Sequence, residues 1–243
     1  MAQKHGTAGK STREMEMKRY FSRVFLFLLG IAVVGIFYFV STKIFLSHTK
    51  GIFAAIGLFI VVVVIKIMFN NIDKADRDIY KLEKRARKGA KAEEIVGNIL
   101  EQLPQGYAVF HDVKSQYGNI DHVVVNKEGA IFLIETKSHH GTVTSNGNSL
   151  FINNKLPEKD FISQALNNTF WLKDQIKTYL GEAPYITPII VFSNAFVRIP
   201  SPVKGVFVIN KKYLSDLLNR PPDKAKIFQK KDLCSVLYQL TSK

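Results

Sequence analysis

Cysteine is almost absent from this sequence, because Cys234 is the only one among 243 residues. A single cysteine cannot form a disulfide within the chain, and such a composition is typical of a reducing compartment. The sequence also lacks the spaced cysteines and histidines of a zinc site. His139 and His140 are adjacent, but no cysteine or histidine at ligand spacing accompanies them. We therefore expect these two histidines to be loop residues.

Charge is missing from two long stretches near the N-terminus. Val24–Thr42 is 19 residues long and has no charged residue, and Gly51–Phe69 has only Lys66. About 20 apolar residues in a helix cross the hydrocarbon core of a bilayer, and a lysine near the end of a span can extend its amine to the headgroups. We therefore expect two transmembrane helices within 24–69, joined by an outside loop at 43–50. A buried core helix and a cleaved signal peptide are the alternatives.

Positive charge is concentrated around these two runs. Residues 1–91 carry 17 basic and 6 acidic residues, a balance of +11, whereas residues 92–243 carry 17 and 14, a balance of +3. Basic residues next to a span stay on the cytoplasmic side, so we expect a multi-pass protein of the cell membrane with both termini in the cytoplasm. Membrane lipid is then a partner of the basic segments. The mild charge of residues 92–243 is weak evidence for a nucleic-acid partner.

The rest of the sequence alternates between helical and strand patterns. A helix is predicted at 73–103, which is rich in Lys, Glu, Ala and Arg and has apolar residues at helical spacing after Gly89. A second helix is predicted at 159–180, where apolar residues recur at helical spacing. Short apolar runs between turn-forming residues predict strands at 107–113, 123–125, 130–134, 142–144, 150–152, 186–192 and 206–209. Two short helices are expected at 213–218 and 232–240. This order is typical of an α/β fold with a mixed β-sheet flanked by helices.

The predicted elements divide the chain into four parts. A basic, cytoplasmic N-terminal tail covers 1–23, and its first 11 residues are polar and expected to be disordered. The two expected transmembrane helices follow at 24–69. A basic helical connector covers 70–88, and a folded domain covers 89–243.

The sequence IDHVVVNKEGAIFLIETK, residues 120–137, predicts a hairpin. A three-residue loop, 127–129, would place Gly129 in the left-handed conformation that such loops favour. In that register Asp121 lies directly opposite Glu135, and Lys137 shares their face of the sheet. A two-residue loop would shift the register by one and separate the two acids onto opposite faces. The glycine favours the first register.

Two facing carboxylates repel each other unless positive charge lies between them. Lys137 alone could supply that charge, so a surface salt-bridge cluster is one interpretation. A divalent cation supplies more, and oxygen ligands suit Mg²⁺ or Mn²⁺. A neighbouring lysine can then stabilise charge on a phosphate. Asp121, Glu135 and Lys137 therefore have the chemistry needed to hydrolyse a phosphodiester.

An aspartate followed by Glu-x-Lys on the next strand resembles the PD-(D/E)xK nucleases, which have the restriction-endonuclease-like fold. Ile120 stands where that family name has proline. The wider pattern is similar to the nuclease-related domain (NERD) over about residues 88–215. The residues that carry the resemblance are Gly89, Glu93, Gly118–Val125, Gly129, Ile134–Lys137, Gly141, Gln164 and Val191–Ala195.

The resemblance implies roles for individual residues. Asp121 and Glu135 correspond to catalytic metal ligands, with the carbonyl of Thr136 as a third ligand. Lys137 corresponds to the catalytic lysine. The metal implied is Mg²⁺ or Mn²⁺.

Two further side chains are implied to join this site. Glu93 corresponds to a catalytic glutamate on the preceding helix. Glu94 is the alternative, because Ala92 stands where the family usually has glycine. Gln164 corresponds to a polar position near the site, although it could instead hydrogen-bond a loop.

These expectations combine into a membrane-anchored, metal-dependent nuclease that cleaves nucleic acid, DNA or RNA, on the cytoplasmic side. The alternative is a non-catalytic, nuclease-like module that binds nucleic acid or a protein at the membrane. The complete acid, acid and lysine set favours the enzyme. The mild charge of residues 92–243 favours the binding module.

Overall fold

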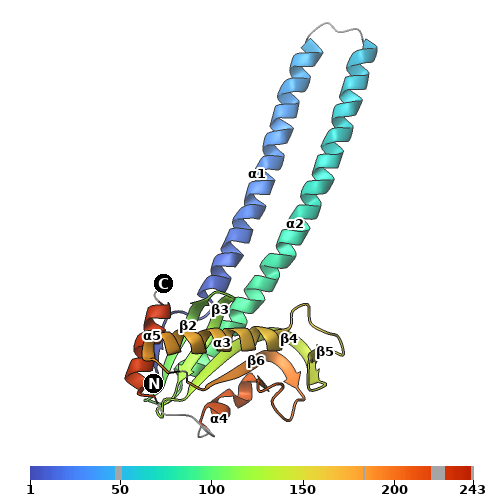
Figure 1. The fold of residues 1–243 in the computed structure, drawn as a ribbon. Coiled ribbons are helices and arrows are strands. Elements are labelled where there is room, and N and C mark those ends of the chain that lie inside the picture. Colours follow the sequence, from blue (N-terminus) through green and yellow to red (C-terminus); the bar gives the residue numbers. More distant parts are fainter. Residues whose placement is uncertain (47–50, 183, 220–227, 242–243) are drawn as a thin grey trace. The chain divides into compact units, whose positions relative to one another are not determined.

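The computed structural model describes residues 1–46, 51–182, 184–219 and 228–241. The described residues leave out part of the loop expected at 43–50, and also many side chains between 34 and 76. The chain divides into two compact units. One consists of Met1–Thr12 with Lys88–Lys243, and the other is Arg13–Arg87. Figure 1 shows the elements in chain order.

The unit Arg13–Arg87 is helical. It contains most of α1 (Lys10–Leu46) and the first part of α2 (Gly51–Glu101). Ion pairs join the two helices, with Arg23 at 3.1 Å from Glu83 and Arg87 at 2.8 Å from Glu16. Within the described residues, no helix has both the length and the hydropathy needed to cross a membrane, so the two expected spans are not supported.

The N-terminal segment is not disordered, contrary to the expectation from its polar composition. Strand β1 (Gln3–His5) pairs in parallel with β2 (Ala108–Ser115). The His5 ring also stacks on Phe110 at 4.7 Å between centroids. The expectation failed because main-chain pairing at a sheet edge needs no apolar run in the added strand.

The other unit is built on a mixed sheet. Seven strands are seen in the described residues, in the order β1-β2-β3-β4-β6-β7, with β5 paired to β4. The central strands are β3 (Gly118–Val125) and β4 (Ile131–Ser145), and the remaining strands are β5 (Leu150–Ile152), β6 (Ile186–Val197) and β7 (Phe207–Asn210). Strand β3 is antiparallel to both of its neighbours, β2 and β4, whereas the pairs β1–β2, β4–β6 and β6–β7 are parallel.

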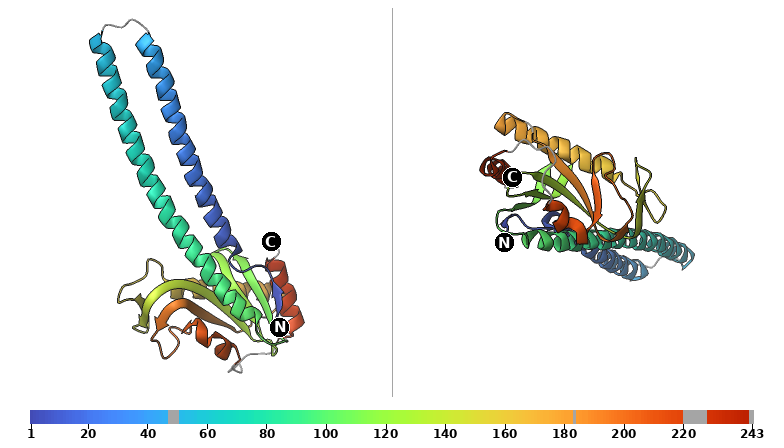
Figure 2. Two further views of the ribbon diagram at one scale, coloured as in Figure 1. Left: turned by 180° about the vertical axis from the view of Figure 1, so that it is seen from behind. Right: turned by 90° about the horizontal axis from the view of Figure 1, so that it is seen from below.

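Helices cover both faces of this sheet. On one face, α3 (Phe161–Leu180) and α5 (Lys230–Thr241) pack against Phe110, Val123 and Leu133. On the other face, the last turns of α2 and the short α4 (Leu214–Leu218) pack against Val109, Val124 and Ile134. Figure 2 shows the sheet between α3 and the end of α2. The expected mixed sheet flanked by helices is confirmed.

The register of the central hairpin is also confirmed. His122 pairs with Ile134, and the pairing continues to Val125 and Ile131. The loop is the expected three-residue one, because the N–H of Asn126 donates to the carbonyl of Ala130 at 3.0 Å. Gly129 has φ +82°, the left-handed value that favours glycine. Local turn chemistry therefore determines which residues lie together at the far end of the hairpin.

Strand β4 is longer than expected. The segments 130–134 and 142–144, predicted as separate strands, belong to one strand that ends at Ser145. The register with β6 shifts between Lys137 and His140. This irregularity follows directly after the Glu-Thr-Lys segment, and it explains why the alternating pattern breaks there in the sequence.

Candidate active site

The candidate site lies where the β3–β4 ladder ends. The last paired residues are His122 and Ile134, so Asp121 and Glu135 do not form the next ladder pair that was expected. Instead, the Asp121 carboxylate accepts a hydrogen bond from the N–H of Thr136 at 2.6 Å. The neighbouring β2–β3 ladder is irregular at the same level, because Asp112 has φ +59° and is skipped in the pairing. Asp121 therefore holds β3 and β4 together through its side chain.

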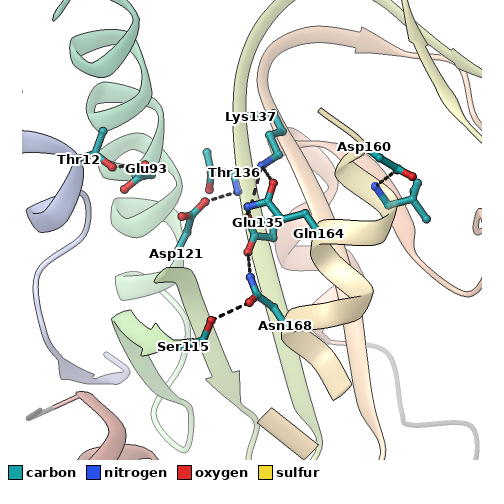
Figure 3. A network of polar contacts seen from close by, with 11 residues as sticks. Thr12, Glu93, Ser115, Asp121, Glu135, Thr136, Lys137, Asp160, Gln164 and Asn168 are labelled. Atoms are coloured by element: carbon teal, nitrogen blue, oxygen red, sulfur yellow. Dashed lines mark hydrogen bonds and ion pairs between the residues drawn. The ribbon is translucent and has the colours of Figure 1, made fainter. Parts of the chain in front are cut away.

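Glu135 is almost fully buried, with 1% of its surface exposed. Its carboxylate receives the side-chain amide of Gln164 on one oxygen at 3.0 Å and that of Asn168 on the other at 2.8 Å. The ammonium of Lys137 lies 3.4 Å from the oxygen that Gln164 contacts. Figure 3 shows these groups converging from β4 and α3. Burying a carboxylate is costly unless it is paired and hydrogen-bonded, and these contacts meet that requirement.

Lys137 is held in place from several sides. Its ammonium donates to the side-chain oxygen of Gln164 at 3.0 Å and lies 4.8 Å from the centre of the Phe161 ring. The side chain is only 12% exposed. Gln164 therefore contacts both the acid and the lysine, which orders the two charges relative to each other.

Helix α3 begins at a fixed point beside these residues. The Asp160 side chain caps the helix by accepting the N–H groups of Ile162 and Ser163. This cap, shown in Figure 3, sets where Gln164 and Asn168 point, since they lie one turn apart on the same helix face.

Glu93 approaches from α2. It is buried, and the hydroxyl of Thr12 donates to one of its oxygens at 2.8 Å. Burial raises the pKa of Glu93 to about 7, and the hydrogen bond from Thr12 opposes that shift. The charges of Glu135 and Lys137 also act on it. The carboxylate of Glu93 thus interacts with other residues expected at the site.

Asp121 lies between the remaining acids. Burial raises its pKa well above the ordinary value, and the negative charges of Glu135 and Glu93 raise it further. The ammonium of Lys137 and the N–H of Thr136 act in the opposite direction. One lysine is thus shared among three carboxylates, so the site has an excess of negative charge that a cation would relieve.

The metal ligands expected from the sequence are all oxygen atoms. In the part of the chain that the structure describes, no cluster of three or more His, Cys, Asp and Glu could hold a metal. The ligand set expected from the sequence is different, because it joins Asp121 and Glu135 to the carbonyl of Thr136. The hydroxyl of Thr136 is buried without a hydrogen-bond partner. An oxygen-only set with few carboxylates suits Mg²⁺ or Mn²⁺ better than zinc.

Sequence reasoning missed three contributors to this network. Asn168 was not among the site residues expected from the sequence, but it is fully buried and donates to Glu135. Asn168 lies four residues after Gln164, so both are on the same helix face, and this spacing could have indicated that Asn168 is near the site. The Ser115 hydroxyl lies 2.9 Å from the side-chain oxygen of Asn168, which orients the amide so that its NH₂ faces Glu135. Thr12, more than 80 residues before its partner, gave no local signal.

Three histidines lie on β3 and β4, the strands that carry Asp121 and Glu135. His122 is buried, and its ring nitrogen lies 2.8 Å from that of His111. His139 packs against Phe161 at 5.3 Å between ring centres. His140 is exposed on β4.

Comparison with known families identifies one part of the chain. Residues 88–193 match the family model of the nuclease-related domain, NERD. The matched region contains the five side chains expected at the site, which are Glu93, Asp121, Glu135, Lys137 and Gln164. The NERD match does not extend to the N-terminal segment that carries Thr12. Searches among curated proteins and among solved structures found no match.

Replacing Asn168 with alanine should destabilise the NERD domain by about 1–3 kcal/mol, since the buried carboxylate of Glu135 loses a donor. The matched control is Asn167→Ala, an exposed position on the same helix, which should change stability by less than about 0.5 kcal/mol. Chemical denaturation of the full chain measures both. Equal stability of the two variants would show that the amide does not support Glu135.

Glu93→Gln should alter how stability depends on pH. The pKa of Glu93 in the folded chain, about 7, lies above the ordinary value of 4.5. Between these values the folded chain retains a proton that the unfolded chain has released. The stabilising contribution is therefore complete below pH 4.5 and is lost as the pH rises through about 7.

The size of this loss is on the order of 3 kcal/mol. Unfolding measured in steps from acidic to neutral pH, without divalent metal, should show a shallower decline for Glu93→Gln than for the wild type. Parallel curves for the two proteins would contradict the raised pKa.

Proposed function

We propose that the NERD domain is a metal-dependent nuclease that hydrolyses phosphodiester bonds in nucleic acid. The observation that supports this most directly is the convergence of Asp121, Glu135 and Lys137 at one end of the hairpin. The excess of negative charge there supports a bound cation, and the NERD match supports nuclease chemistry.

In this proposal Asp121, Glu135 and the carbonyl of Thr136 hold Mg²⁺ or Mn²⁺. When bound, the metal lowers the pKa of a water and stabilises charge on the scissile phosphate. Asn168 and Gln164 keep the Glu135 carboxylate in one orientation, so that little reorganisation is needed when substrate binds.

Lys137 has a fixed direction because Gln164 and Phe161 confine its side chain. Its ammonium can donate to a phosphate oxygen or orient the attacking water. Glu93 has a pKa of about 7, so near neutral pH it can accept or release a proton. These roles need no rearrangement of the hydrogen bonds that surround Glu135.

The alternative is a module that binds nucleic acid or a protein without cleaving it. The mild +3 balance of residues 92–243 favours this alternative, since a nuclease that grips a phosphate backbone gains affinity from a strongly basic surface. The two functions differ in their dependence on Glu135 and on metal.

Glu135→Gln and Lys137→Ala should each lower the cleavage rate about 100-fold or more, because each removes a charge at the reacting phosphate or its metal. The matched controls are Glu128→Gln and Lys127→Ala, which change an exposed ion pair in the loop at the opposite end of the same hairpin. The full chain should be used, since β1 and Thr12 belong to the same unit as the site. The wild type and each variant are incubated with DNA or RNA in the presence of Mg²⁺, Mn²⁺ or EDTA.

Cleavage that needs metal and is lost in the site variants supports the nuclease. The absence of any metal-dependent cleavage, or full activity in Glu135→Gln, would overturn it. Salt-dependent binding that survives both EDTA and Glu135→Gln would favour the binding module.

We further propose that the segment 24–69 attaches the chain to the cell membrane with the NERD domain in the cytoplasm. The support comes from the two runs that lack charge and from the basic residues that flank them. The described part of α1 also exposes large apolar side chains, among them Phe25, Phe27, Ile31 and Phe39. Much of the second run lies outside the described side chains.

The membrane proposal predicts that the full chain stays with membranes after an alkaline carbonate wash. It also predicts that a protease added to the cytoplasmic side digests the NERD domain. Release of the chain by carbonate would overturn the proposal that segment 24–69 spans the membrane. Protection of the domain in sealed vesicles of cytoplasmic-side-out orientation would overturn the topology.

A further inference from the structure

The N-terminal segment is fitted closely to the unit that carries the site. Its backbone pairs with β2, and Lys4 forms an ion pair with Glu101 of α2 at 2.7 Å. Ala8 is buried directly over Gly97, where a side chain on the glycine would approach the methyl of Ala8 to 2.6 Å. A segment that merely lay on the surface would not need a glycine beneath it.

Two glycines let the segment turn at this place. Gly6 and Gly9 have φ +79° and +72°, where other residues are strained. A Cβ on Gly6 would also lie 2.5 Å from the carbonyl oxygen of His111. The path of residues 6–9 is therefore defined by backbone geometry as well as by contacts.

Asp112 anchors the end of the segment next to the site. Its carboxylate accepts the N–H of Ser11 at 2.9 Å and the hydroxyl of Ser11 at 2.7 Å. Asn119 donates to the same carboxylate at 2.6 Å. These contacts satisfy an N–H in the first turn of α1, which otherwise has no partner within the helix. They also place the next residue, Thr12, against Glu93.

Thr12 then fixes one oxygen of the Glu93 carboxylate. The hydroxyl donates at 2.8 Å, and Figure 3 shows Glu93 between Thr12 on one side and Asp121 and Thr136 on the other. The contact with Thr12 therefore restricts the orientation of the Glu93 carboxylate. Glu93 is buried, so little solvent is present to replace the lost donor.

We propose that the N-terminal segment, Met1–Thr12, contributes to the active site and that Thr12 is a positioning residue for Glu93. The idea rests on the proposed nuclease function. It adds a residue from outside the NERD match, 76 positions before that match begins. The segment completes a site that the matched region would leave with an unsupported acid.

The test compares Thr12→Val, which keeps the shape and removes the hydroxyl, with Thr12→Ser, which keeps the hydroxyl. Thr7→Val is the matched control, because Thr7 is an exposed threonine of the same segment. Full chains are compared for kcat and KM on the nucleic acid that the wild type cleaves, for Mn²⁺ affinity by titration calorimetry, and for exchange of backbone amides in residues 3–11.

Thr12→Val should lower kcat about tenfold or weaken Mn²⁺ binding by a similar factor, with KM and the protection of residues 3–11 unchanged. Thr12→Ser and Thr7→Val should match the wild type. A Thr12→Val protein with normal kcat and normal Mn²⁺ affinity would overturn the proposal, as would a serine variant that behaves like the valine one. Loss of amide protection in Thr12→Val would show that the residue only holds the segment in place, and would also overturn it.

The two proposals fail in different ways. A wild type that cleaves nothing overturns the nuclease, and the Mn²⁺ comparison between Thr12→Val and Thr12→Ser then decides the role of Thr12. If the wild type binds no Mn²⁺, both the proposed metal ligands and the proposed role of Thr12 are overturned.

Discussion

The burial of one carboxylate, that of Glu135, is the constraint on which the site depends. An ionised carboxylate inside a protein is tolerated only with compensating charge and hydrogen bonds. Here the compensation comes from a lysine two residues along the same strand and from two amides on α3. The register of β4, the start of α3 and the orientation of Asn168 are therefore linked, because a shift in any of them would leave the acid without partners.

The same constraint explains the irregular geometry around the acid. Asp121 uses its side chain, not its backbone, to bridge β3 and β4, and β2 is irregular at the adjacent Asp112. Each departure from regular pairing frees a carboxylate or an N–H for another use. Asp112 anchors the N-terminal segment, and Asp121 remains close to Glu135 and Glu93. Irregular strands often lie next to functional sites for this reason.

Local chemistry made some of this predictable. The loop and register of the hairpin followed from Gly129 and from the alternation of apolar residues, and both were confirmed. The side chain of Asp121 departed from the prediction, since a carboxylate competes with the backbone as an acceptor and local pattern does not reveal which one wins. Asn168 was underestimated because its partner, Glu135, is 33 residues away.

The N-terminal segment was the largest error, and its cause is general. Residues 1–11 are polar and rich in small side chains, a composition that usually indicates disorder. Small residues also permit close approach, which is how Gly6, Ala8 and Gly9 are used. A sequence pattern cannot separate these two uses of small residues, because the difference lies in the surface that the segment meets. That surface is formed by β2 and α2, whose contacting residues lie about 80 or more positions later in the sequence.

The arrangement of the acids argues for a site that is incomplete as a set of protein groups alone. Glu135 is compensated by Lys137, Gln164 and Asn168, whereas Asp121 and Glu93 share that lysine and accept hydrogen bonds from Thr136 and Thr12 respectively. Their raised pKa values express this shortage. A purely structural salt-bridge cluster would place its positive charge where the repulsion is greatest. In this site the lysine lies instead on the α3 side of Glu135, against Gln164 and Phe161. In the proposed function, a bound cation would supply the positive charge beside Asp121 and Glu93.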